Sequence, residues 1–251
     1  MTTSPLDTQF SDPLFTPLDS SHIPKHVAMI MDGNRRWAKQ RDLPTAMGYW
    51  EGAEVLTSIV RTASELGVQT VTIYAFSTEN WKRPKEEIDV IMQVLEIYLI
   101  CEKDLMIREG IRLDMIGNLE KFPKTLRDAF HLTKQATEHC RKINLVLALN
   151  YGARDEIRRA VTQILHLHQA KGLSPEDITE EMIAEHLDTS PFGDPELMIR
   201  TGGELRVSNF LLWQISYAEL YVTEKLWPDF SSKDLAEAVM VFQHRKRRFG
   251  G

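Results

Sequence analysis

The stretch HVAMIMDGNRRWAKQR, residues 26–41, changes from apolar to charged within a few positions. Its first six residues have the length and composition of a buried strand. Directly behind them stand one carboxylate, Asp32, one glycine, Gly33, and two adjacent arginines, Arg35 and Arg36. This order predicts a strand that ends in a charged loop, and it raises the question of which group lies between the carboxylate and the arginines.

Short apolar runs like this one alternate with longer helical patterns along the chain. We expect strands at residues 26–31, 70–76, 111–116, 143–149 and 196–200, and a weaker one at 219–223. We expect helices at residues 47–66, 84–109, 124–140, 153–170, 176–187 and 232–245. Such alternation predicts an α/β fold with a single domain, in which a mostly parallel sheet of about six strands is flanked by helices.

Composition and charge narrow the possible functions. The chain has 251 residues, 43% of them hydrophobic, which suits one sizeable core, and its interior contains no linker-like stretch. A net charge of −6 argues against a nucleic-acid partner, because such a partner needs a basic face. Cys101 and Cys140 are far apart in the sequence. We therefore expect neither a zinc site nor a disulfide framework, and we expect a cytoplasmic location.

Neither the N-terminal segment nor the most apolar helix indicates a membrane anchor. Residues 1–23 lack the basic and apolar regions of a signal peptide. We expect them to form a mobile N-terminal arm, with residues 24–251 as the folded domain. The helix at 84–109 is interrupted by polar residues such as Asp89, so it should not cross a bilayer. At most a peripheral membrane contact is expected.

The same helix carries two apolar stripes. The first has the spacing of one helix face and consists of Ile88, Ile91, Met92, Leu95 and Leu99. The second consists of Val90, Val94, Ile97 and Ile100 or Cys101. Two stripes indicate either a helix that is buried nearly all round or one that lines an apolar cavity as well as the core.

Four predicted strands are followed by loops that are more polar than a turn requires. These loops are DGNRRW (32–37), STENWKRP (77–84), NYGARDE (150–156) and RTGGELRVSNF (200–210). Because the carboxyl ends of parallel strands meet at one edge of a sheet, the charged side chains of these loops should converge there. The converging side chains are Asp32, Arg35, Arg36, Arg83, Arg200, Glu204 and Arg206.

Clustered arginines in an acidic protein indicate a ligand with several negative charges. A guanidinium group donates two parallel hydrogen bonds to phosphate, and glycines at 33, 202 and 203 let backbone N–H groups approach it. A carboxylate among them suits Mg²⁺, which is typically bound by one or two carboxylates and by phosphate oxygens. The residues therefore predict a magnesium–diphosphate site. No GxxxxGK(S/T), GxGxxG or HExxH motif supports a nucleotide or zinc site.

Each of these features also has an ordinary structural explanation. DGN is a common turn sequence, and neighbouring Asp and Arg residues usually form surface ion pairs of little energetic value. Tryptophans such as Trp37, Trp81 and Trp213 are more often core residues than residues that stack on a ligand, and a basic tail like that at 244–251 is ordinarily a solvated end. The occurrence of four such loops at four strand ends favours the functional interpretation.

Several motifs resemble those of the cis-prenyltransferases, in particular the bacterial undecaprenyl diphosphate synthases. They are MDGNRRWAK, YAFSTENWKRP, NYGARDEI, RTGGELRVSNFLLWQISYAELYVTEKLWPDF and the terminal RRFGG. The resemblance runs from His26 to Gly251 in the motif order of the family. It implies a Mg²⁺-dependent transferase that condenses isopentenyl diphosphate repeatedly onto an allylic diphosphate, usually farnesyl diphosphate. The product would be a long Z-polyprenyl diphosphate such as undecaprenyl diphosphate, a lipid-carrier precursor for cell-wall synthesis.

By position, the resemblance also implies roles for individual residues. Asp32 would hold Mg²⁺ and assist departure of the allylic diphosphate, Glu219 would join it at the metal, and Asn80 would help to remove a proton after C–C bond formation. The residues implied at the allylic diphosphate are Gly33, Asn34, Arg35, Arg36 and Trp37. Those on a mobile loop that positions both substrates are Ser77, Asn80, Trp81 and Arg83. Those at the diphosphate of isopentenyl diphosphate are Arg200, Arg206 and Ser208.

Two larger features also follow from the resemblance. Family members form homodimers in which a C-terminal R-x-G motif, here Arg248, Phe249 and Gly250, reaches the site of the partner subunit. A growing polyprenyl chain needs an apolar tunnel. The helix at 84–109 would be a wall of this tunnel, and Ile143 with its strand would be the floor.

The chain departs from the family pattern shortly after the first motif. Thr45 stands where bacterial members have an arginine, and Tyr49, in GYWEG, stands where they have a histidine. Both usual residues help to bind the allylic diphosphate. Tyr49 can still donate a hydrogen bond, but it carries no positive charge. We expect Arg41, four residues before Thr45, to supply the missing cation.

Two alternative functions stay open at this point. The chain could be a non-catalytic partner subunit on the same fold, or a polyanion-binding module without turnover. The presence of Asp32, Arg200, Arg206 and Glu219 favours the enzyme, because a degenerate subunit should lose its metal carboxylate first. The product length and the preferred allylic primer do not follow from the sequence.

Overall fold

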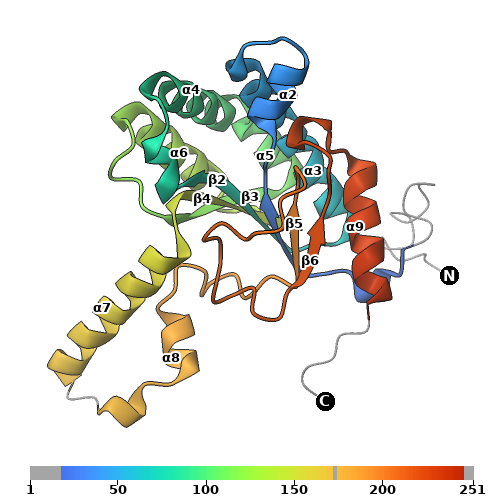
Figure 1. Ribbon diagram of the computed structural model, residues 1–251. Coiled ribbons are helices and arrows are strands. Elements are labelled where there is room, and N and C mark those ends of the chain that lie inside the picture. Colours follow the sequence, from blue (N-terminus) through green and yellow to red (C-terminus); the bar gives the residue numbers. More distant parts are fainter. Residues whose placement is uncertain (1–17, 172–173, 246–251) are drawn as a thin grey trace.

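The computed structural model describes residues 18–171 and 174–245 (Figure 1). Its centre is a six-stranded sheet in the order β3-β4-β2-β1-β5-β6, in which all neighbouring strands are parallel. The strands are β1 (His26–Ile30), β2 (Thr70–Ser77), β3 (Ile111–Gly117), β4 (Ile143–Tyr151), β5 (Leu197–Arg200) and β6 (Glu219–Val222). The predicted single α/β domain with a parallel sheet is confirmed.

Helices connect the strands in nearly the predicted order. They are α2 (Asn34–Gln40), α3 (Thr45–Leu66), α4 (Lys85–Cys101), α5 (Lys103–Glu109), α6 (Lys124–Ala136), α7 (Ala153–Lys171), α8 (Glu180–Glu185) and α9 (Ser232–His244). Short 3₁₀ turns are η1 (Ser20–His22), η2 (Thr78–Lys82), η3 (Pro175–Asp177) and η4 (Trp227–Asp229).

Three helix predictions were wrong. Helix α2 was not expected, because NRRWAKQ has no apolar periodicity. The single helix predicted at 84–109 consists of α4 and α5, which meet at Glu102, where the carboxylate accepts a hydrogen bond of 3.1 Å from Thr57. The helix predicted at 176–187 is reduced to η3 and the short α8.

The sheet is covered on both faces, as parallel strands require. Helices α3, α4, α6 and α9 pack on one face and form the larger core with it. The other face packs against the start of α7 and against the segment between β5 and β6, with Phe210 and Leu211 fully buried. All five residues of β1, in the middle of the sheet, are buried. Figure 1 shows α7 and α8 as an arm that projects from this body.

Residues 18–23, the last part of the predicted N-terminal arm, contact the body of the domain. Leu18 is buried in the larger core. The backbone N–H of Asp19 donates to Gln243 of α9, and the Gln243 amide donates to the carbonyl groups of Asp19 and His22. Residues 1–17 lie outside the described part of the chain. Within the described residues, no helix has the length and apolarity needed to span a bilayer.

The strand register places the predicted functional loops along one edge of the sheet. Ile30, the last residue of β1, is paired with Arg200, the last residue of β5. The ends of β2 and β4 lie side by side, because Ser77 is paired with Tyr151. All four polar loops therefore leave the sheet at its carboxyl edge, as predicted.

Candidate functional site

Two adjoining cavities lie at the carboxyl edge of the sheet. The first has a volume of about 660 Å³ and is lined by residues at the ends of β1, β2 and β5 and by residues of α3 and α4. The second has a volume of about 680 Å³ and is lined mainly by α2 and the residues around it. The two cavities meet at residues that line both of them. These shared residues are Met31, Asp32, Asn34, Tyr49 and Arg83.

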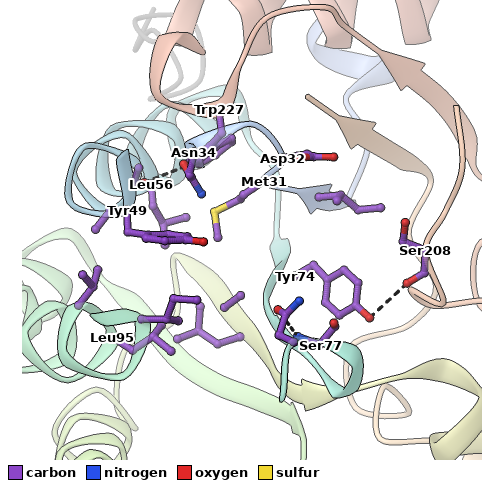
Figure 2. Close-up of a pocket in the computed structure, with 18 of the residues that line it drawn as sticks. Met31, Asp32, Asn34, Tyr49, Leu56, Tyr74, Ser77, Leu95, Ser208 and Trp227 are labelled. Atoms are coloured by element: carbon purple, nitrogen blue, oxygen red, sulfur yellow. Dashed lines mark hydrogen bonds between the residues drawn. The ribbon is translucent and has the colours of Figure 1, made fainter. Parts of the chain in front are cut away.

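The cavities differ in character. Figure 2 shows the first cavity with polar side chains, Asp32, Tyr74 and Ser208, on one side and with Leu56 and Leu95 on the other. Its apolar part is completed by Ala53, Ile91, Val94, Tyr98 and Leu147. The second cavity is basic. Its charged lining residues are Asp32, Arg35, Arg36, Lys39, Asp42 and Arg83. Together the cavities suit a ligand with an anionic head and a hydrocarbon tail.

Arg200 is the most firmly fixed cation of the site. It is only 3% exposed, at the end of β5. Its Nη2 donates to Asp32 Oδ2 at 2.8 Å, and its Nη1 donates to Ser208 Oγ at 2.8 Å and to the Arg206 carbonyl. Its Nε has no partner among the described residues. The arginine therefore links the first and last polar loops before any ligand is bound.

Asp32 is held from two sides. Its backbone N–H donates to Thr201 Oγ1 at 2.9 Å, and the Thr201 hydroxyl donates back to the Asp32 carbonyl at 2.7 Å. Its other carboxylate oxygen lies 3.3 Å from Arg36 Nη2, and Arg36 Nη1 donates to the Gly202 carbonyl at 2.8 Å. A Cβ atom at Gly202 would lie 2.3 Å from Arg36, so only glycine permits this contact. The predicted convergence of Asp32, Arg36 and Arg200 is confirmed.

Gly33 meets a similar constraint between β1 and α2. Its φ of 114° lies in the left-handed region, and a Cβ atom there would lie 2.9 Å from Leu226. Asn34, the next residue, lines both cavities, and its Oδ1 is buried without a hydrogen-bond partner among the described residues. Asn34 is thus placed at the site, as expected.

The loop after β2 is built by its own side chains. Asn80 Oδ1 accepts a hydrogen bond of 3.0 Å from the Ser77 backbone N–H and caps η2. Ser77 and Asn80 line the first cavity. Trp81 does not line either cavity: it packs edge-on against Phe76, and its Nε1 donates to Asn150 at 2.8 Å. The Trp81 side chain packs against the larger core, and this position gives no support for its predicted substrate contact.

Tyr49 and Arg83 belong to a cluster that the motifs did not reveal. Tyr49 Oη donates to Glu87 Oε1 at 2.6 Å, and Arg83 Nη1 donates to Tyr49 Oη at 2.6 Å and to Glu87 Oε1 at 2.9 Å. Arg35 lies 3.6 Å from Glu87 Oε2. Burial raises the pKa of Tyr49, and the hydrogen bond to Glu87 raises it further. The phenol therefore stays protonated, and its proton points to Glu87 and not into a cavity, contrary to our expectation.

The sequence contained one signal for Glu87. It stands four residues after Arg83, at the start of α4, and this is the spacing of an ion pair along a helix. Its side chain is 11% exposed, which is low for a carboxylate at a helix start.

Arg41 and Trp37 lie apart from both cavities. The Arg41 guanidinium group stacks over the Trp37 ring at 4.3 Å from its centroid, and Arg41 Nη2 is 2.9 Å from Asp229 Oδ1. Trp37 Nε1 donates to the same oxygen at 2.7 Å. The prediction that Arg41 replaces a missing cation at the allylic site finds no support, because Asp229, 188 residues away in the chain, pairs with it. Thr45 does line the second cavity.

Glu219 does not join Asp32 within one chain. It begins β6 and is paired with Leu197, at the opposite end of β5 from Arg200, and its carboxylate accepts from Arg245 Nη1 at 2.7 Å. Within a single chain, Glu219 and Asp32 therefore lie at opposite ends of the neighbouring strands, and a shared metal site stays a prediction. Arg206 and Glu204 form an exposed ion pair of 2.5 Å beside the first cavity. Arg248, Phe249 and Gly250 lie outside the described residues.

Among the described residues, no three acidic, histidine or cysteine side chains are grouped as metal ligands. Asp32 nevertheless fits Mg²⁺. It is a carboxylate that lines both cavities, beside arginines able to hold a diphosphate whose oxygens would complete the coordination. Two groups of cationic donors, one on each side of this carboxylate, can hold two anionic ligands, and fixed donors of this kind stabilise charge on a leaving group.

Comparisons with known proteins identify the family of the chain. Residues 30–250 match a family model described as "Putative undecaprenyl diphosphate synthase". An isoprenyl transferase from Geobacillus kaustophilus is 48% identical over 91% of this chain and 89% of its own length. One from Bacillus anthracis is 46% identical over 98% of this chain and 95% of its own length.

Solved structures show the same relation. Lavandulyl diphosphate synthase from Lavandula x intermedia, in complex with dimethylallyl diphosphate, superposes with a TM-score of 0.90 at 36% identity, over 92% of this chain and all of that one. A "probable undecaprenyl diphosphate synthase" from Campylobacter jejuni superposes with a TM-score of 0.76 at 35% identity, covering 91% of this chain and 99% of that one. The chain therefore belongs to the undecaprenyl diphosphate synthase family of prenyltransferases.

Proposed function

We propose that this protein extends farnesyl diphosphate by repeated cis addition of isopentenyl diphosphate and releases a long polyprenyl diphosphate such as undecaprenyl diphosphate. The observation that carries the proposal is the position of the Asp32–Arg200 ion pair, 2.8 Å long, beside a basic cavity and an apolar one. In this arrangement the allylic diphosphate lies near Arg35, Arg36 and Arg83, and its hydrocarbon tail lies in the first cavity.

The second diphosphate belongs on the other side of Asp32. Arg200, Arg206 and Ser208 line the first cavity there, and they bind the diphosphate of isopentenyl diphosphate. The two substrates then lie head to head. Asp32 would hold Mg²⁺, which would supply charge neutralisation for the diphosphate that leaves.

The protein's own groups carry the rest of the reaction. The allylic C–O bond breaks, and its electron pair leaves with the diphosphate, which Arg35, Arg36 and Arg83 stabilise. The double bond of isopentenyl diphosphate supplies the electrons of the new C–C bond, and a proton then passes from the added isoprene unit to an oxygen of the departed diphosphate. Asn80 remains the candidate for assisting this proton loss. Its Oδ1 already accepts from Ser77, and the oxygen keeps a second lone pair for a proton donor.

The apolar end of the first cavity is the proposed site of the growing chain. Ile91, Val94, Leu95 and Tyr98 of α4 form its wall, and Leu147, on the same strand as Ile143, forms its floor. Tyr98 is the bulkiest of these side chains and is only 7% exposed. If the cavity is the tunnel, Tyr98→Ala lengthens the mean product by at least one isoprene unit. An unchanged product distribution would contradict the tunnel assignment.

The proposal also includes a cytoplasmic homodimer. Residues 24–251 form its catalytic unit, and Arg248, Phe249 and Gly250 contact the site of the partner subunit. Sedimentation of the full chain tests the dimer. A chain that sediments as a monomer at the concentration used in the activity assay would contradict it.

Turnover is tested by incubating the pure protein with radiolabelled isopentenyl diphosphate, farnesyl diphosphate and Mg²⁺, followed by butanol extraction and product sizing. We expect a labelled long-chain lipid, and a rate about 10²–10³-fold lower for Asp32→Asn. Absence of any labelled lipid would reject the enzyme. Activity that appears only with an added protein would indicate a non-catalytic partner subunit, and diphosphate binding without turnover would indicate a polyanion-binding module.

A further inference from the structure

Glu87 lies directly behind the wall where the two cavities meet. It does not line either cavity, but Tyr49 and Arg83, which it contacts at 2.6 and 2.9 Å, line both. Arg35, which lines the second cavity, lies 3.6 Å from its other oxygen. One carboxylate thus contacts three side chains from three parts of the chain: α2, α3 and the loop before α4.

The hydrogen bonds of the cluster have a defined direction. Tyr49 gives its only proton to Glu87 and accepts from Arg83 Nη1, so the phenol has no proton left for a ligand. Arg83 uses Nη1 for both of its contacts, and its Nε and Nη2 have no partner among the described residues. These two nitrogens are therefore free to donate to an anion in the cavities that Arg83 lines.

The charges of the cluster also favour binding of an anion. Two arginines face one carboxylate, which leaves one positive charge toward the cavities. Without the carboxylate, the positive charges of Arg35 and Arg83 would repel each other, and the Arg83 side chain would lose the acceptor that holds its Nη1. Glu87 therefore holds the cations in place but does not cancel them.

We propose that Glu87 is a positioning residue for the allylic diphosphate: it aligns Tyr49 and Arg83 so that the free nitrogens of Arg83 meet that diphosphate. This inference rests on the proposed function. It also accounts for Tyr49, which replaces the histidine of the family pattern and acts through Glu87 and Arg83 rather than on the ligand. No contact of Glu87 with substrate is required.

The test compares Glu87→Gln with Glu86→Gln. Glu86 is the preceding residue on the same helix turn, is exposed and does not line a cavity, so it is a matched control. Binding of farnesyl diphosphate is measured by calorimetry with Mg²⁺ and without isopentenyl diphosphate, so that no transfer occurs. The KM values of both substrates, kcat and the melting temperature are measured alongside.

For Glu87→Gln we expect the Kd and KM of farnesyl diphosphate to rise about tenfold, as for the loss of one charge-assisted hydrogen-bond partner. The KM of isopentenyl diphosphate and the melting temperature should not change, and Glu86→Gln should match the wild type. In a Tyr49→Phe background the effect of Glu87→Gln should shrink, because one of the two aligned groups is already lost.

Three results would overturn the inference. An unchanged Kd would show that Glu87 positions nothing, and a lower Kd would show that it competes with the diphosphate for the arginines. An equal rise in the KM of both substrates with a lower melting temperature would show a purely structural role. If the wild type itself neither binds farnesyl diphosphate nor turns over, the proposed function fails and the inference fails with it. A failure confined to the variant leaves the proposed function intact.

Discussion

Two tyrosine–glutamate hydrogen bonds lie on opposite faces of the sheet. Tyr49 donates to Glu87 at 2.6 Å beside the cavities, and Tyr151 donates to Glu156 at 2.5 Å in the smaller core. The bonds are alike, but their surroundings differ. Glu87 is also contacted by arginines, whereas the other donors to Glu156 are neutral: the Gln214 amide and the backbone N–H of Asp188.

This difference in surroundings indicates that Tyr49 and Glu87 form a functional pair and that Tyr151 and Glu156 form a structural one. Glu156 is 1% exposed, and its oxygens accept only from groups of the protein itself. It joins β4 and α7 to the segment before β5, where Asp188 forms a two-pronged ion pair with Arg159 at 2.6 and 2.7 Å. Around Glu87, by contrast, Arg83 keeps free nitrogens at a cavity wall. We therefore expect changes at Glu156 to affect stability and changes around Glu87 to affect ligand binding.

The largest effect is expected for Glu156→Ala. It leaves the Tyr151 hydroxyl and the Asp188 N–H without an acceptor, and the Gln214 amide keeps only its hydrogen bond to Thr189. Each buried donor left unpaired costs about 1–3 kcal/mol, so the free energy of unfolding should fall by roughly 3–5 kcal/mol. Urea denaturation measures the change. Below the new transition, the Kd of farnesyl diphosphate should stay within about twofold of the wild-type value. A loss of stability below about 1 kcal/mol would show that water replaces the carboxylate.

The hydrogen bonds around Glu156 could not be predicted from the sequence, whereas most strands of the sheet could. Each strand is a short apolar run between polar turns, and its register follows from the βαβ pattern, so the predicted strands begin and end within about two residues of the observed ones. The junction of α4 and α5 at Glu102 was missed, because the apolar periodicity continues through it. The partners of Glu156 come from segments up to 58 residues away, and no local pattern encodes them.

The candidate site could be predicted only in part, because local patterns encode strand ends but not long-range contacts. Asp32, Arg36 and Arg200 follow directly from strand ends, so their convergence follows from topology. The partner of Arg41 depends on how α2 packs against η4, and the end of β6 that carries Glu219 depends on the register with β5. These are long-range packing properties, which the motifs do not encode.

The second effect in size concerns the functional pair. Arg83→Ala removes the guanidinium group that carries the free nitrogens, so the Kd of farnesyl diphosphate should rise about 10–100-fold by calorimetry. Because the Arg83 side chain is 31% exposed, the free energy of unfolding should change by less than about 1 kcal/mol. Arg61→Ala, at an exposed position on α3, is the control and should leave Kd unchanged. A Kd of Arg83→Ala equal to that of the control would show that the allylic diphosphate lies elsewhere.

The third prediction removes the same atom from both pairs. Tyr151→Phe takes one of three neutral donors from a fully buried carboxylate, and we expect it to lower the free energy of unfolding by about 1–2 kcal/mol. Tyr49→Phe leaves Glu87 paired with Arg83, and we expect a change below about 0.5 kcal/mol. Parallel urea titrations measure both. Equal losses of stability in the two variants would erase the distinction between the structural and the functional pair.

The smallest effect is a pH dependence at Glu156. Burial raises the pKa of Glu156 above its ordinary value of 4.5, and the nearby negative charge of Asp188 adds to this shift. When the pH rises from 4.5, the glutamate ionises first in the unfolded chain, while the folded protein keeps the proton. The unfolded state is therefore favoured, and this residue's contribution to stability falls as the pH rises toward the folded-state pKa.

Glu156→Gln isolates this contribution, because the amide does not titrate and the other groups titrate alike in both proteins. We subtract the unfolding free energy of the variant from that of the wild type. This value should be larger at pH 4.5 than at pH 7, by about 1.4 kcal/mol for each unit by which the pKa of Glu156 is raised. Urea titrations at both pH values measure it. A difference that grows with pH would mean that the neutral donors around Glu156 stabilise its charged form more than burial disfavours it. In that case its environment would be closer to that of Glu87 than the contacts indicate.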